Sequence, residues 1–263
     1  MKTSLNTIKY VLILAGVFLL LAYSISLNIE NKFFILDTFW LSNDFFFAIA
    51  GGSFASLLVI LVCELQKYFL LKRQTEDCIY NQLFALYSQI TIIHYNTERQ
   101  LNDTNISVPY NLIEEVANRG QLCLNNLVSI DYTIFDKYNT IKGILNLYSG
   151  NNGMCIRSFL QDSVFLKIAI NEDKMEMLRR GRDEIVTSSS PKTNLTLKKI
   201  FDDSSAVLTL IENSLDTIDK ECKKRYHWND VKRNMISYEE NFVFADLDSF
   251  LKFPTLHFES ENK

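Results

Sequence analysis

The chain contains few residues that interrupt helices, with only 8 glycines and 3 prolines among its 263 residues. Glycine and proline mark turns and end helices, so their scarcity over so long a chain favours long helices. The length is sufficient for one buried core in addition to a membrane segment. We therefore expect an all-α fold.

Residues with catalytic or metal-binding spacing are also scarce. None of the 3 histidines lies at metal-ligand spacing from another histidine, a cysteine or a carboxylate. The 5 cysteines are far apart and include no C-x-x-C pair, which argues against a disulfide framework or a zinc site. Phosphate-binding glycine loops and the G-x-S-x-G turn are absent. We expect no metal, no cofactor and no catalytic residue, so the protein is not an enzyme unless catalytic groups converge from distant positions.

Neither sign of charge is in large excess, since the formal net charge is −4 at pH 7. Acids and bases nearly balance in the part of the chain that follows residue 66. This balance argues against a generally basic surface that coats nucleic acid, and it confines any such binding to a local patch.

Two long apolar runs lie near the N-terminus, at residues 8–27 and 45–63. No charged residue occurs between Val11 and Leu27 or within 45–63, and each run is long enough to cross a hydrocarbon core about 30 Å thick. The sequence therefore predicts a transmembrane hairpin over residues 1–66, in contact with the lipid bilayer. Residues 67–263 form a second domain.

The distribution of lysine and arginine predicts the orientation of this hairpin. Lys2 and Lys9 precede the first run, and three bases follow the second run within ten residues, whereas the linker carries only Lys32. By the positive-inside rule both termini face the cytoplasm. A cleaved signal peptide is the alternative for the first run. It leaves Glu64 and everything after it in the cytosol as well.

Small residues gather on one face of the second run and are expected to mediate close helix packing. They are Ala48, Gly51, Gly52, Ala55 and Ser56. The packing is either between the two spans of one chain or between subunits, and the sequence leaves both open. Two spans cannot enclose a pathway, so a pore needs a homo-oligomer of several chains.

After the second run, apolar residues follow the 4, 3, 4, 3 spacing of a helix seam. They are Ile79, Leu83, Leu86, Ile90 and Ile93. We expect the second span to continue as a helix through this seam, with an end near 102–105, into a cytosolic helical bundle. The other expected helices cover 111–148, 154–186 and 195–226, with a break near 129–131 and loops at 149–153 and 187–194. A seam of this kind holds a bundle together or serves as an oligomer interface.

A basic and aromatic cluster near the C-terminus is the candidate ligand-binding site. Its members are Lys220, Lys223, Lys224, Arg225, His227, Trp228, Lys232 and Arg233. We expect Lys220, Lys223, Lys224 and His227 to share one helical face. Cations interleaved with aromatic rings bind phosphates and stack on bases, which suits a nucleotide or nucleic-acid ligand. The alternative is structural: the cations complement a helix C-terminus, Asp230 caps the next helix, and nearby acids pair with the bases.

The layout of this chain resembles that of the two-transmembrane effectors of bacterial antiphage defence systems, both retron-associated and nucleotide-gated. The spans 8–27 and 45–63, the short linker and the helical cytosolic domain carry this resemblance. It implies a location in the bacterial inner membrane and a cytosolic part that holds or releases a membrane-disrupting state. A regulatory protein is a further candidate partner. The alternative function is a membrane-anchored scaffold that holds a soluble partner at the bilayer without forming a pore.

Overall fold

The computed structural model describes residues 9–18, 20, 43–103, 108–135, 139–181 and 185–241, with the side chains of 43–50 and 235–241 excepted. Every regular element within these residues is a helix, which confirms the all-α prediction. The chain divides into two compact units. Unit 1 comprises residues 1–75 and 133–135, and unit 2 comprises 76–132 and 136–263.

The longest element is α2, a 60-residue helix from Asn43 to Asn102 whose sequence enters both units. Among the described residues it is the one helix long and apolar enough to cross a membrane, and none of its most apolar 18-residue stretch is buried. This length and composition are compatible with membrane association. The expected continuation of the second run into the seam is confirmed, because α2 contains both without a break.

Unit 1 also contains a short apolar helix, Lys9–Phe18, inside the first predicted span. Val11 and Ala15 on this helix are buried, while Tyr10, Ile13 and their other large apolar neighbours are exposed. The linker and residues 21–27 of that span lie outside the described residues. The two-helix hairpin therefore stays a prediction.

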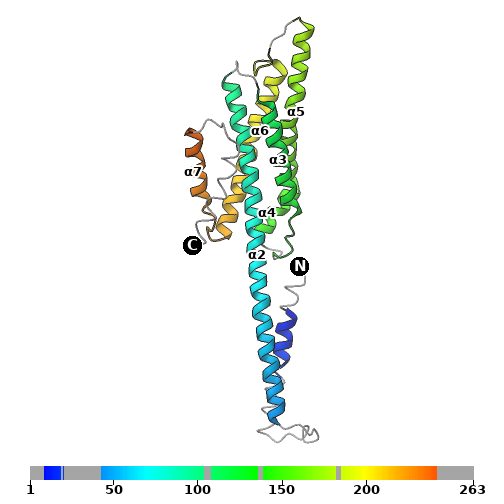
Figure 1. Cartoon of the computed structure of the whole chain (residues 1–263), viewed down its shortest axis with the longest axis vertical. Helices are drawn as coiled ribbons and strands as arrows, with labels where there is room; N and C mark the ends of the chain where they lie inside the picture. The colour runs from blue at the N-terminus through cyan, green and yellow to red at the C-terminus, as the bar shows by residue number, and fades with distance from the viewer. Residues whose placement is uncertain are drawn as a thin grey trace. The chain divides into compact units, whose positions relative to one another are not determined.

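Unit 2 is a helical bundle, as expected. Figure 1 labels its helices along the bundle part of α2. Their bounds are α3 Tyr110–Ser129, α4 Thr140–Ser149, α5 Asn151–Arg179, α6 Pro191–Glu221 and α7 Trp228–Asn241. Helix α5 packs against α3, α4 and α6, and α7 contacts α6.

The predicted seam lies in the core of this bundle, since all five of its residues are 0% exposed. A Cβ atom added to Gly120 of α3 would lie 2.9 Å from Leu160 of α5 and 3.7 Å from Leu86 of the seam. Three helices therefore approach closely at this glycine, and burial of the seam is what joins α2 to the rest of unit 2.

Several predicted boundaries were wrong. Helix α5 ends at Arg179, seven residues before the expected end at 186, and α6 begins at Pro191 instead of 195. Proline suits the first helical turn because the amide hydrogen that it lacks has no partner there. The buried carboxylate of Asp173 accepts the backbone N–H of Thr193 at 2.7 Å and caps this start from a neighbouring helix. Residues 132–135, expected to be helical, are not, whereas the breaks near 102–105 and 129–131 are confirmed.

His94 contributes to the core contact between α2 and α6. Its Nδ1 atom lies 2.7 Å from the Ser204 hydroxyl, and its ring stacks on Phe201 at 4.8 Å between centroids. Burial lowers the pKa of His94 from its usual value, against the opposing charge of Glu98. The neutral imidazole is therefore the form that the bundle favours.

The corner between α4 and α5 generates a test of the fold. A Cβ atom at Gly153 would lie 1.8 Å from the carbonyl oxygen of Tyr148, a backbone atom that cannot move aside. Gly153→Ala is expected to lower the free energy of unfolding by at least about 2 kcal/mol.

The control is Gly143→Ala on the exposed face of α4, where nothing lies within 4 Å. It should raise that free energy by up to about 1 kcal/mol. Urea unfolding of the full-length protein in detergent, followed by helical circular dichroism, measures both. Equal effects would contradict the close packing at this corner.

Candidate functional site

The candidate site is the junction between α6 and α7 and its contacts with α2. Helix α6 ends at Glu221 and α7 begins at Trp228. Between them Lys223, Lys224 and His227 have positive φ angles of 57°, 58° and 49°. This left-handed backbone costs a residue other than glycine about 1 kcal/mol, so three such residues in one short junction require compensating contacts.

Asp219 on α6 supplies the first of these contacts. Its side chain is buried, and its two carboxylate oxygens accept the backbone N–H groups of Tyr226 at 2.8 Å and Trp228 at 3.0 Å. Its carbonyl oxygen accepts the backbone N–H of Lys224. Asp219 therefore fixes both ends of the junction and places a negative charge at the start of α7. The expectation that Asp230 caps this helix was wrong, because Asp230 lies within its first turn.

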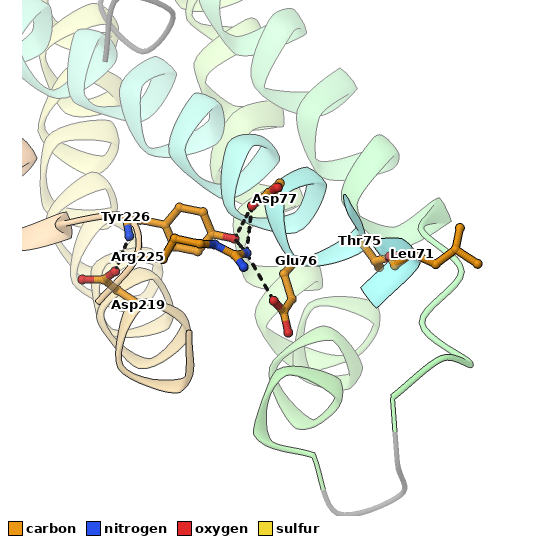
Figure 2. A network of polar contacts seen from close by, with 7 residues as sticks. All are labelled: Leu71, Thr75, Glu76, Asp77, Asp219, Arg225 and Tyr226. Atoms are coloured by element: carbon orange, nitrogen blue, oxygen red, sulfur yellow. Dashed lines mark hydrogen bonds and ion pairs between the residues drawn. The ribbon is translucent and has the colours of Figure 1, made fainter. Parts of the chain in front are cut away.

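Arg225 connects the junction to α2, as Figure 2 shows. Its Nη2 atom lies 2.8 Å from an oxygen of Asp77 and 3.2 Å from one of Glu76. The guanidinium also lies over the Tyr226 ring, 4.7 Å from its centroid, and the Tyr226 hydroxyl donates to the same Asp77 oxygen at 2.8 Å. The Arg225 side chain is 25% exposed and that of Glu76 is 11% exposed, so the pair is partly shielded from water.

Aromatic rings extend this contact along α2. The Tyr226 ring stacks on Tyr80 with centroids 4.0 Å apart and planes 6° apart. Trp228 is 1% exposed and meets the rings of Phe84 and Tyr87 edge-on. Together Glu76, Asp77, Asp219, Arg225 and Tyr226 form what we call the clasp, a polar network that holds α2 against the α6–α7 junction.

Ionisation of the clasp reflects its burial. Burial works to lower the pKa of Arg225, but contacts with Tyr226 and Asp77 outweigh it and raise that pKa, so the arginine stays charged. Burial raises the pKa of Tyr226 and keeps its hydroxyl protonated as a donor. Burial and the charge of Glu76 raise the pKa of the Cys222 thiol to about 11. The thiol next to the clasp is therefore unreactive at neutral pH.

The structure separates the predicted basic cluster into three groups. Arg225 and Trp228 are parts of the packing just described. Lys220 pairs with Asp216 and Lys232 pairs with Glu212. The remaining members, Lys223, Lys224, His227 and Arg233, are exposed, and the last two lie within 4 Å of the exposed Asp230.

The expected helical face formed by Lys220, Lys223, Lys224 and His227 was wrong. The helix ends before Lys223, and the last three of these residues have left-handed backbone. The acids that the structural alternative expected as partners of these bases, Glu239, Glu240, Asp246 and Asp248, have side chains outside the described residues. Whether the exposed members bind a ligand stays a prediction.

The predicted packing face on α2 has no cover among the described residues. Gly51, Gly52, Ala55 and Ser56 are exposed, and a Cβ atom at either glycine would meet nothing within 4 Å. The Ser56 hydroxyl donates to the Gly52 carbonyl at 2.9 Å, so its polar group is satisfied within the helix. The side chain of Ala48 lies outside the described part of the chain.

The clasp offers a mechanical connection in place of a catalytic one. No group of three or more His, Cys, Asp or Glu side chains that could hold a metal occurs in the described part of the chain. Three carboxylates, one arginine and one tyrosine instead connect α2 to the α6–α7 junction.

Comparison with known proteins adds no assignment, since no protein family, curated protein or solved structure matches this chain.

Sequence reasoning missed the acidic half of the clasp. Glu76 and Asp77 directly precede the seam, and Asp219 occupies an inward position one residue after Ile218 on an otherwise apolar face. The signal was an acid on the buried face of a helix, because a buried charge requires a partner. Arg225 is the base that pairs with Glu76 and Asp77.

Removal of Arg225 tests the clasp. Arg225→Ala leaves the buried Glu76 carboxylate without its cation and is expected to lower the free energy of unfolding by about 1–3 kcal/mol. The matched control is Arg233→Ala, because that side chain is 80% exposed and lies 3.8 Å from Asp230. Exposed pairs contribute about 0–1 kcal/mol. Denaturant unfolding of both full-length variants measures the difference, and equal losses would contradict a structural role for the clasp.

Proposed function

We propose that this protein is a membrane effector of antiphage defence in the bacterial inner membrane. Its cytosolic bundle senses a nucleotide, nucleic-acid or protein signal. The signal changes how the hairpins of an oligomer pack, and the oligomer then permeabilises the membrane. Both termini lie in the cytoplasm.

The single observation that carries this proposal is the continuity of α2. One helix contains an exposed apolar stretch, which includes Leu58, Val59 and Val62, and a fully buried seam that begins at Ile79. An unbroken helix is stiff over this length, so a rotation imposed on the seam reaches the apolar stretch. A plain anchor does not need this continuity.

The uncovered small-residue face supports contacts between subunits. Exposed glycine and alanine let a neighbouring backbone approach closely, which is the main source of helix association in lipid. Gly52 lies at the centre of this face and has open space around it. In the proposed oligomer, α2 of a neighbouring subunit packs against this face.

A large side chain at Gly52 is expected to block this association. Gly52→Leu should reduce the depolarisation caused by induced expression at least tenfold, because its side chain keeps neighbouring helices apart. Leu57→Phe is the control, since Leu57 lies about 140° around α2 from Gly52 and so outside the small-residue face. A chain that lacks residues 1–63 sets the baseline. A voltage-sensitive dye in bacteria reports all four proteins. A Gly52→Leu variant that depolarises as fast as the wild type contradicts an oligomer built on this face.

The scaffold alternative is favoured by large apolar side chains exposed on the bundle, of which Ile185 and Leu195 are 74% and 72% exposed. Such side chains suit a soluble partner protein. Replacement of residues 1–66 by an unrelated two-pass anchor separates the two functions. The scaffold retains its activity after this exchange, whereas the effector loses it.

A further inference from the structure

Two lysines of the α6–α7 junction are exposed and lack a counter-charge. Lys223 and Lys224 have no ion-pair partner among the described residues, whereas Lys220 and Lys232 in the same cluster each have one. Their left-handed backbone is held by hydrogen bonds to the carbonyl groups of Lys220 and Asp219. Within the part of the chain that the structure describes, the junction therefore presents two positive charges without an ion-pair partner beside the clasp.

Arg225 follows these lysines directly and is incompletely satisfied within the clasp. Its Nη2 atom serves Glu76, Asp77 and the Tyr226 hydroxyl together, while its buried Nε atom has no hydrogen-bond partner. An arginine whose donors are unevenly used has more to gain from another acceptor, because a phosphate accepts from two of its nitrogens at once.

We propose that Lys223, Lys224 and Arg225 form a binding site for a phosphate-bearing anion, and that the anion opens the clasp. This inference rests on the proposed function and names the signal that controls it. An anion on the two lysines attracts Arg225 and repels the carboxylates of Glu76 and Asp77, so both forces separate the junction from α2. The anion binds the open state better than the closed one, and this difference in affinity shifts the population.

Opening has a direct structural consequence for α2. With Arg225 withdrawn, Glu76 and Asp77 become solvated and the stack between Tyr226 and Tyr80 loses its support. The junction is then free to leave its left-handed backbone. The first turns of the buried part of α2 lose one packing partner, which permits the rotation that the effector requires.

Cys222 reports the state of the clasp without any engineered label. Its thiol is half-buried next to the network and has a pKa raised to about 11. Opening removes the burial, which is the largest cause of the raised pKa, together with the smaller and opposed effects of Glu76 and Arg225, so the thiolate fraction and the rate of alkylation rise together. Peptide-resolved mass spectrometry follows this one cysteine in the full-length protein.

The test compares iodoacetamide alkylation of Cys222 in detergent-solubilised full-length protein with sodium tripolyphosphate and with sodium chloride of equal ionic strength. Tripolyphosphate is expected to accelerate the reaction about tenfold. Parallel arms with ATP and a short oligodeoxythymidylate distinguish a nucleotide from a nucleic-acid source of the phosphate. Equal rates in tripolyphosphate and chloride would overturn the proposal.

Removal of the two lysine charges, compared with removal of two lysine charges elsewhere, tests where the anion binds. The double variant Lys223→Gln, Lys224→Gln should lose the acceleration by tripolyphosphate. The control, Lys174→Gln with Lys198→Gln, removes the same charge from exposed positions on α5 and α6 and should keep it. If the first variant still responds fully, the anion acts elsewhere and the proposed site is wrong.

We call this anion-controlled opening of the clasp the latch. A charge exchange distinguishes the latch from a merely structural contact. Arg225→Asp should make Cys222 react fast without any anion, and Asp77→Arg in the same chain should slow it again. If Arg225→Asp leaves the rate unchanged, the clasp does not control access to this cysteine and the latch is excluded.

Failure of the latch and failure of the proposed function give different results. A protein that opens with tripolyphosphate but never depolarises a membrane supports the latch and contradicts the effector. Depolarisation by a protein whose Cys222 ignores all three phosphate compounds supports the effector and contradicts the latch.

Discussion

One helix, α2, combines an exposed apolar stretch with a buried seam, and the proposed function depends on that combination. Over its apolar stretch it leaves large side chains such as Val59 exposed, which costs free energy in water and none in lipid. From Ile79 onward the same helix buries its seam completely. The same helix contains both stretches without a break.

The clasp stands at the beginning of the buried stretch of α2. Glu76 and Asp77 are acids at the start of this stretch, and one arginine pairs with both of them. The buried Asp219 holds that arginine's own segment in a left-handed conformation. The junction thus combines a backbone cost of about 1 kcal/mol for each left-handed residue with contacts that offset it. Segments with such opposed contributions change state more readily than a regular helix does.

The elements that follow from local pattern were predictable from the sequence. The spacing of Ile79, Leu83 and Leu86 sufficed to place the seam in a core, because helix periodicity determines which side chains share a face. Pro191 was read as part of a loop, although proline is equally suited to the first turn of α6. The end of α5 at Arg179 was missed, although Gly181, with a φ of 67°, is the kind of left-handed glycine that commonly follows a helix end.

Tertiary contacts account for the remaining differences at the candidate site. Lys223, Lys224 and His227 were expected to share a helical face with Lys220 because of their i, i+3, i+4 and i+7 spacing, but Asp219 and the burial of Trp228 impose a turn there instead. Arg225 was recognised as basic, yet its partners lie about 150 residues earlier in the chain. No local pattern connects residues so far apart, whereas an unpaired acid on a buried face does signal that a partner exists.

The most direct test of this account is a set of insertions in α2 between Lys67 and Tyr68, assayed by membrane depolarisation on induced expression in bacteria. Two alanines turn the apolar stretch by about 200° relative to the seam, whereas seven restore its phase to within about 20°. A third insert of seven residues contains glycine and proline and breaks the helix. Rigid transmission predicts depolarisation with seven alanines and loss of it with the other two inserts. Equal depolarisation by all three would contradict the claim that α2 carries the signal to the membrane.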